Sequence, residues 1–121
     1  MHFWLLSLAT LAFCVIPVEG REIIHRIALK PQKERVIAGR IPTPDDVVVY
    51  RFEARAGQHI SIRLEPAAPL IAQTQIVPPS GKALGPGAEL DAVLDESGTF
   101  QIRVIPRERS SGTFRLHLIL R

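Results

Sequence analysis

The sequence predicts an all-β protein: a single antiparallel β-sandwich, jelly-roll or Greek-key-like, with about seven or eight strands after an N-terminal signal peptide. Three observations predict this fold class. Apolar residues alternate with polar ones along most of the chain after residue 20, turn-forming residues separate the alternating stretches, and no segment there keeps a helical period. Two stacked sheets bury the apolar faces of such strands in one core.

The chain opens with an apolar segment that does not alternate. The stretch Phe3–Ile16 carries no charge, and Val18 and Gly20 occupy the two positions that a signal peptidase reads. A spanning helix needs about 20 apolar residues, so this stretch is too short to cross a bilayer. We expect residues 1–20 to be a signal peptide and residues 21–121 to form one domain. The alternative is a buried N-terminal helix, which is normally amphipathic.

Cys14 is the only cysteine in the sequence. A lipid anchor on it would require a small preceding residue, whereas Phe13 is large. Removal of the signal peptide therefore leaves a domain without disulfides, although its destination is oxidising. Packing must supply its stability.

The formal net charge is +3, all Lys and Arg follow residue 20, and cleavage removes Glu19. A basic exported domain favours anionic partners, such as an acidic protein or a polyanionic envelope glycan. Nucleic acid is not expected, because the domain lacks a series of exposed aromatic residues. We expect a periplasmic or secreted protein with no stable membrane span after cleavage.

Four strands are expected in the first half of the domain. Glu22–Leu29 alternates Ile with polar residues, and Arg35–Gly39 is a short candidate. The alternation is clearest in Asp46–Ala54 and His59–Glu65, where every second residue is apolar. Such strands have one buried and one solvated face, as in antiparallel sheets.

Four more strands are expected in the second half. Leu70–Val77 and Ala88–Leu94 are weaker candidates, whereas Thr99–Ile105 and Thr113–Arg121 alternate clearly. Gly85–Gly87, with Pro86 at its centre, reads as a turn.

The alternation also predicts the core. A shift of one residue would bury arginines in place of apolar side chains, so the inward set of each strand is well defined. The expected core residues are Val48, Tyr50, Phe52, Ile60, Ile62, Leu64, Leu94, Phe100, Ile102, Val104, Phe114, Leu116 and Leu118.

Three motifs together resemble a known family. They are Val48–Gln58 (VVYRFEARAGQ, which ends in a Gly turn), Pro78–Gly81 (PPSG) and Leu94–Val104 (LDESGTFQIRV). From about Arg35 to Arg121 the chain resembles the bacterial pre-peptidase C-terminal (PPC) type of β-sandwich. Small exported proteins of similar pattern include periplasmic inhibitors of g-type lysozyme.

The resemblance implies a binding or accessory role rather than catalysis, and no cofactor. Domains of this type usually carry Tyr where this chain has Phe100 and Phe114.

Four arginines lie on the outward faces of the four clearest strands: Arg51, Arg63, Arg103 and Arg115. If those strands share one sheet, the arginines form a basic stripe that could bind an anionic partner. The alternative is that they keep the surface soluble and block edge pairing.

The turn Ser97-Gly98 is the second candidate binding element, because loops on a rigid sandwich commonly carry function. The carboxylates Asp91, Asp95 and Glu96 precede it. They lack the alternating ligand spacing of a calcium loop, so a solvated acidic turn is favoured, and calcium binding stays open.

No catalytic or metal site is expected. The chain has no Gly-x-Ser-x-Gly motif, and His25, His59 and His117 fall in three different strands. The sequence therefore predicts an exported non-enzymatic binding protein, and the resemblance implies an inhibitor of a cell-wall hydrolase such as g-type lysozyme. The alternative is a glycan- or envelope-binding accessory module.

Overall fold

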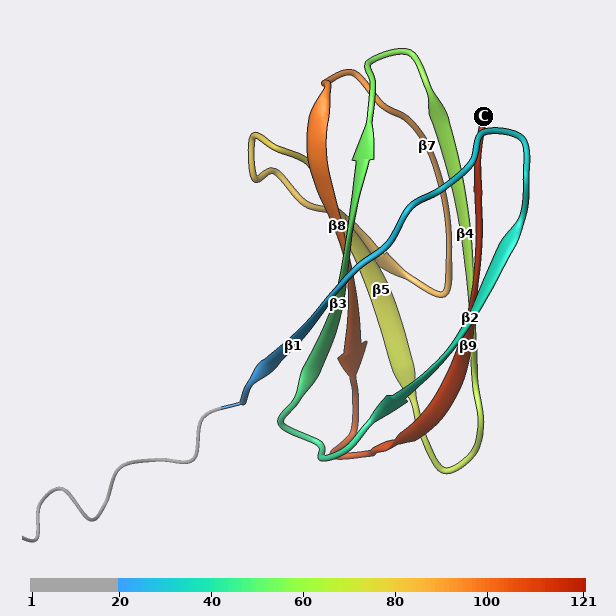
Figure 1. Cartoon of the computed structure of the whole chain (residues 1–121). Helices are drawn as coiled ribbons and strands as arrows, with labels where there is room; N and C mark the ends of the chain where they lie inside the picture. The colour runs from blue at the N-terminus through green and yellow to red at the C-terminus, as the bar shows by residue number, and fades with distance from the viewer. Residues whose placement is uncertain (1–19) are drawn as a thin grey trace, which may run out of the picture.

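The computed structural model describes residues 20–121, which form two β-sheets packed face to face (Figure 1). The all-β sandwich is confirmed, with nine strands in this range. No helix long and apolar enough to cross a membrane occurs among these residues. The predicted signal peptide and Cys14 lie outside the described residues, apart from Gly20.

The first sheet has five strands in the order β1-β3-β8-β5-β6. Its members are β1 (Glu22–Arg26), β3 (Val47–Ala54), β8 (Gly98–Pro106), β5 (Ala72–Val77) and β6 (Leu84–Gly87). All of these neighbours pair antiparallel except β1 and β3, which run parallel.

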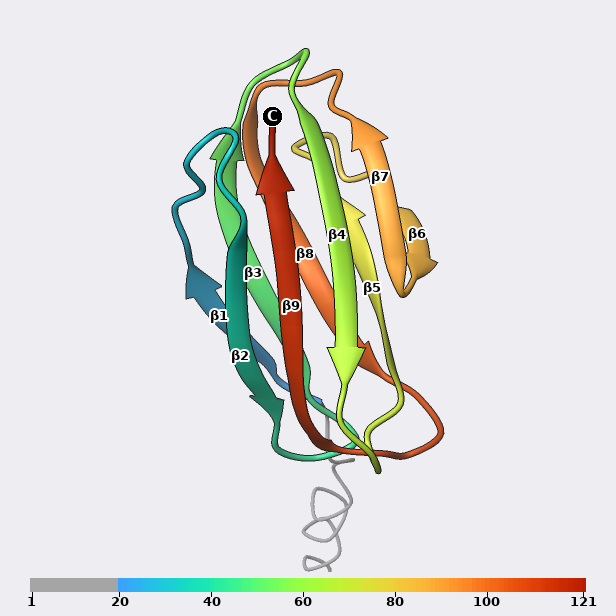
Figure 2. The ribbon, with the colours of Figure 1, turned by 90° about the vertical axis from the view of Figure 1, so that its right-hand side faces the viewer.

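The second sheet has four strands in the order β2-β9-β4-β7, and all its pairs are antiparallel (Figure 2). Its members are β2 (Arg35–Ile41), β9 (Gly112–Leu120), β4 (His59–Pro66) and β7 (Glu89–Val93).

Two details differ from the sequence-based expectation. The parallel pair arises because β2, which follows β1, lies in the other sheet, so no hairpin joins β1 to β3. The turn expected at Gly85–Gly87 is part of β6, which pairs with β5 only at Thr74–Gly87 and Ile76–Leu84, with a register shift between them. Pro86 is tolerated there because β6 is an edge strand, where a missing N–H costs no ladder bond.

The expected core residues are all buried, with at most 4% of any of them exposed. Alternation therefore assigned the inward face of every clear strand correctly. The core also contains apolar residues beyond the expected list: Ile41, Ala54, Leu70, Ala72, Ile76 and Leu120. Phe52 and Phe100 lie opposite each other on β3 and β8, and their rings stack with centroids 5.7 Å apart.

Asp46 is a buried carboxylate that holds the start of β1. Its two side-chain oxygens accept hydrogen bonds from Nε and Nη2 of Arg21 at 3.3 and 3.4 Å, and one accepts from the backbone N–H of Thr43. The bond from Arg21 lowers the pKa of the Asp46 carboxyl, against the opposing effect of burial. The backbone N–H of Val47 also donates to the carbonyl of Arg21, so the residue before β1 is already bonded to the first residue of β3.

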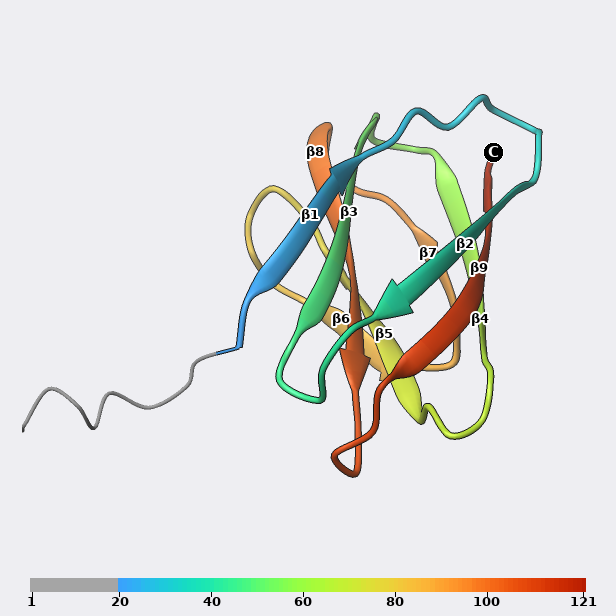
Figure 3. The ribbon, with the colours of Figure 1, turned by 60° about the horizontal axis from the view of Figure 1, so that its bottom comes forward.

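The two long edges of the sandwich differ. On one edge β6 and β7 are separated only by Ala88, so the chain steps directly from one sheet to the other, and the Ala88 carbonyl accepts a hydrogen bond from Leu64. On the other edge β1 and β2 are joined by residues 27–34, which cross between the sheets (Figure 3). That edge is open, and the candidate site lies there.

Replacing Phe100 with Ala should lower the free energy of unfolding by about 3–5 kcal/mol, because it removes a buried ring that stacks on Phe52. Arg103→Ala, on the outward side of the same strand, loses an ion pair to Glu22 (2.6 Å) and should cost at most about 1 kcal/mol. Urea unfolding curves of both variants measure this. Equal losses would contradict the assignment of the two faces.

Candidate functional site

An open groove of about 1030 Å³ runs along the edge where β1 and β2 diverge. We call it the β1–β2 groove. Its interior is formed by four mainly apolar side chains, Ile27, Ile37, Tyr50 and Phe114. Its margins carry four arginines, which are Arg26, Arg35, Arg40 and Arg115.

Gly39 allows two core rings that line the groove to pack against β2. A Cβ atom at this position would lie 2.4 Å from Cζ of Phe114 and 2.6 Å from the hydroxyl oxygen of Tyr50. The absence of a side chain therefore lets both rings pack directly against the backbone of β2. The rings themselves meet edge to face at 6.5 Å, and His25 stacks on Tyr50 at 5.4 Å.

The Tyr50 hydroxyl is a buried polar group at the base of the groove. Tyr50 is 3% exposed, and burial raises its pKa to about 12, so the hydroxyl keeps its proton at neutral pH. Among residues 20–121 we find no hydrogen-bond partner for it. A buried donor without a partner costs about 1–3 kcal/mol, which a suitable acceptor in the groove would recover.

The margin of the groove is electrostatically positive. Among the described residues, Arg26, Arg40 and Arg115 form no ion pair, and Nη1 of Arg35 donates only to the carbonyl of Ala28 at 2.9 Å. The carboxylate among the lining residues belongs to Glu65.

Glu65 lies opposite Arg115 in the register of β4 and β9, but its carboxylate oxygens are held by two other side chains. Its oxygens lie 2.8 Å from Nε2 of His117 and 3.0 Å from Nη1 of Arg63. These two hydrogen bonds, that of His117 first, lower the pKa of the Glu65 carboxyl. The arginines at the margin therefore remain available to an anionic partner.

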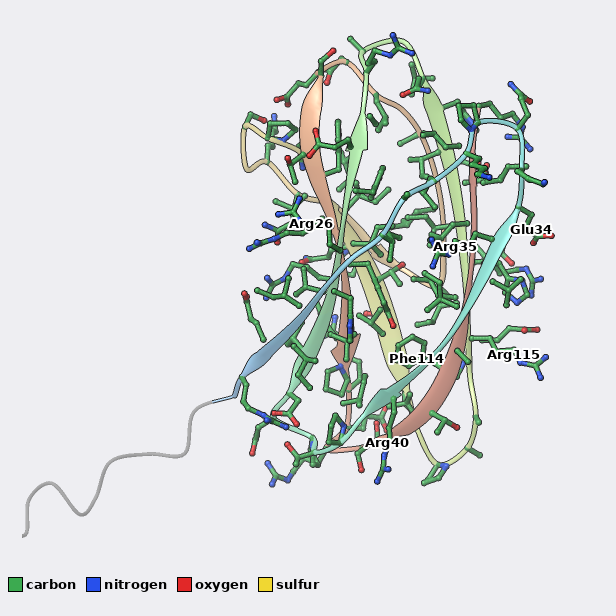
Figure 4. All side chains as sticks on the ribbon, viewed as in Figure 1. Arg26, Glu34, Arg35, Arg40, Phe114 and Arg115 are labelled. Carbon is green, nitrogen blue, oxygen red and sulfur yellow. The ribbon has the colours of Figure 1, made fainter. Side chains whose placement is uncertain are left out.

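The two faces of β2 differ in polarity at the end of the strand, with charged Arg40 on the outer face and apolar Ile41 on the inner face. Figure 4 shows Arg35 and Phe114 beside the gap between β1 and β2, Arg40 at the end of β2 and Arg115 pointing away from that gap. Arg40 and Arg115 are exposed residues on the outer side, next to buried Ile41 and Phe114 on the inner side. The groove is thus apolar inside the sandwich and cationic outside it.

The four arginines expected to form one stripe are divided between the two sheets. Arg51 and Arg103 lie on β3 and β8, whereas Arg63 and Arg115 lie on β4 and β9. A single stripe is therefore wrong, since these strands do not share a sheet. Arg103 pairs with Glu22 and Arg63 with Glu65, and of the four arginines only Arg115 lines the groove.

The Ser97-Gly98 turn is fixed by contacts within the domain. The Ser97 hydroxyl accepts a hydrogen bond from the backbone of Ala56 at 2.9 Å, which ties two turns together. Gly98 has φ of 141°, and a Cβ there would lie 3.0 Å from Cγ of Pro79. Neither residue lines the β1–β2 groove.

The acidic residues near this turn have separate partners. Asp91 lies close to Ser61 and, at 3.5 Å, to Nε2 of His59, whereas Glu96 binds the backbone and hydroxyl of Ser80. Asp91 thus stands between a serine and a histidine, an order that differs from the Ser–His–Asp chain of a catalytic triad.

The histidines also have separate surroundings. His25 stacks on Tyr50, His59 lies near Asp91, and His117 lies between Glu34 and Glu65. No group of three potential metal ligands occurs in the described part of the chain.

The sequence did not single out Gly39, Arg26, Arg35 or Arg40 as site residues. The stretch Arg35–Ile41 (RVIAGRI) does carry a signal, an arginine near each end of a short strand and a glycine between them. That signal becomes informative only once the strand is known to be an edge.

Solved structures of two kinds share this fold. The periplasmic g-type lysozyme inhibitor PliG of Aeromonas hydrophila matches with a TM-score of 0.66 and 18% identity, over 83% of this chain and 99% of that one. PliG of Salmonella Typhimurium matches with a TM-score of 0.62 and 18% identity, over 79% and 97%. The pre-peptidase C-terminal domain of a Bacillus anthracis collagenase matches with a TM-score of 0.61 and 19% identity, over 83% of this chain and 96% of that domain.

The chain therefore has the β-sandwich fold of PPC domains and of the PliG inhibitors, as its motifs indicated. No family model and no curated protein matches the sequence. At these identities the likeness establishes the fold, and the function is a separate question.

Gly39→Ala should destabilise the domain by about 1–3 kcal/mol, because the new methyl group must displace Phe114 and Tyr50. Ala38→Ser, at the adjacent exposed position, should change stability by less than about 0.5 kcal/mol. Thermal or urea unfolding of the two variants measures the difference. A Gly39→Ala variant as stable as the parent would show that the rings do not pack against β2.

Proposed function

We propose that this protein is an exported, non-catalytic binding protein that inhibits a g-type lysozyme. The observation that supports this most strongly is the extent of the match to the Aeromonas hydrophila inhibitor, which covers 99% of that chain. The PPC domain of the collagenase shares the fold but is named as one domain of an enzyme.

The groove supports a protein partner more than a glycan. Carbohydrate sites usually present exposed aromatic faces, whereas Tyr50 and Phe114 are each only 3% exposed. Unpaired arginines favour carboxylates, which they bind with two parallel hydrogen bonds. A glycan- or envelope-binding role is the second outcome that the assay below can return.

We also propose that the signal peptide is removed and that the mature domain works in the periplasm or outside the cell. The PliG structures are of periplasmic proteins. Arg21 supports cleavage before it, because its side chain binds Asp46 and its carbonyl accepts from Val47. A mature chain that starts at Arg21 keeps both attachments.

The purified protein should slow the lysis of bacterial cell-wall suspensions by g-type lysozyme, with inhibition complete near one inhibitor per enzyme. Turbidity measures the rate, and a lysozyme of another structural class is the matched control. A parallel pull-down on peptidoglycan tests the glycan alternative. No effect on lysis at micromolar protein contradicts the inhibitor proposal, and retention on peptidoglycan alone supports the accessory role.

N-terminal sequencing of the protein recovered from its native cell should begin at Arg21 or within a few residues of it. We expect this start because Val18 and Gly20 occupy the positions that a signal peptidase recognises before it cleaves. Recovery of intact Met1 on a cytoplasmic protein would contradict both the location and the proposed partner.

A further inference from the structure

We propose that the β1–β2 groove binds an extended acidic segment of a partner protein, which pairs as an added strand with the free edge of β2. This rests on the proposed function, because it takes the partner to be a protein. It goes further by assigning the surface, the conformation of the bound segment and the pattern of its side chains.

The free edge of β2 is the first observation. β2 lies at the end of its sheet, and all seven of its residues, from Arg35 to Ile41, pair with β9 on one side. In an antiparallel ladder alternate N–H and C=O groups point away from the partner strand. Within residues 20–121 no backbone hydrogen bond from another element reaches these groups. An extended peptide can take them up, as in other cases of strand addition.

The charge at this edge is the second observation. Arg40 and Arg115 lie on the outer side of β2 and β9, and neither has an ion pair among the described residues. Glu65 beside them is held by His117 and Arg63. A carboxylate on the outward face of an added strand would therefore meet two unpaired guanidinium groups.

The apolar interior is the third observation. Side chains on the inward face of an added strand would point into the sandwich, toward Ile27, Ile37 and Phe114. Successive side chains of a strand point to opposite faces. The groove thus fits a segment in which acidic and aliphatic residues alternate, and the Tyr50 hydroxyl offers a donor on the inner side.

Edge protection alone does not explain this arrangement. Charged residues on an edge strand commonly prevent unwanted pairing, and Arg35 and Arg40 could serve that purpose. Arg115, however, lies on β9 and not on the edge strand, so the unpaired positive charge extends beyond β2. Edge protection also requires no apolar interior beside the charges.

The test uses a fluorophore-labelled peptide of about ten residues in which Glu and Val alternate, titrated with the full chain and followed by anisotropy. The charge-reversed variant Arg40→Glu/Arg115→Glu should bind at least about tenfold more weakly. The control Arg55→Glu/Lys82→Glu makes the same change of charge at exposed positions outside the groove, and its affinity should stay within about twofold at about 0.15 M salt.

Two further peptides test strand addition with the unaltered protein, so the result does not depend on how a variant folds. One is N-methylated at every Glu and the other at every Val, which removes the backbone donors of one edge and keeps all charges. One of the two should bind at least about tenfold more weakly than the parent peptide, and the other should bind nearly as well.

Three results would overturn the proposal: no binding of the parent peptide at millimolar protein, equal binding of both methylated peptides and the parent, or equal losses in the two charge-reversed variants. A heparin fragment that displaces the peptide from both variants alike would show a general polyanion surface instead. The lysis assay measures inhibition independently of peptide binding. Inhibition without peptide binding would therefore leave the proposed function intact and contradict only the assignment of this surface.

Discussion

The inner faces of β8 and β9 pack across the centre of the sandwich, and the other strands are arranged around them. β8 pairs with β3 and β5, and β9 pairs with β2 and β4. Their inward residues, such as Ile102 and Leu116, are fully buried. Because no cysteine follows residue 20, the free energy of this packing has no covalent support.

The same core also shapes the groove. Tyr50 and Phe114 belong to the buried cluster and also line the β1–β2 groove, where Gly39 has no side chain to separate their rings from β2. At the opposite edge β6 and β7 follow each other almost without a break, so the chain itself joins the two sheets there. The binding site that we propose at the open edge would therefore be positioned by side chains of the buried core.

The sequence predicted local features well and long-range ones poorly. Alternation identified eight of the nine strands and the inward set from Val48 to Leu118, because the side-chain period of a strand is a local property. It could not show that Arg51 and Arg63 lie in different sheets, or that β2 is an edge, since both depend on pairing between distant segments. Gly39, Arg26, Arg35 and Arg40 were missed as groove residues for that reason, whereas Arg115 was among the candidates. The short strand β6 was missed because Gly and Pro dominate it.

The two strands at the centre of the sheets are also the last two to be synthesised. Before residues 98–120 are available, the only strand pairs of the final structure that can form are β1–β3, β5–β6 and β4–β7. Without β8 and β9 these pairs are not joined into the two sheets, so a chain still emerging from the ribosome cannot form the buried core. The export that we propose for this protein would benefit from such a delay, because a chain crosses a membrane most readily before it folds, and the order of the strands supplies that delay.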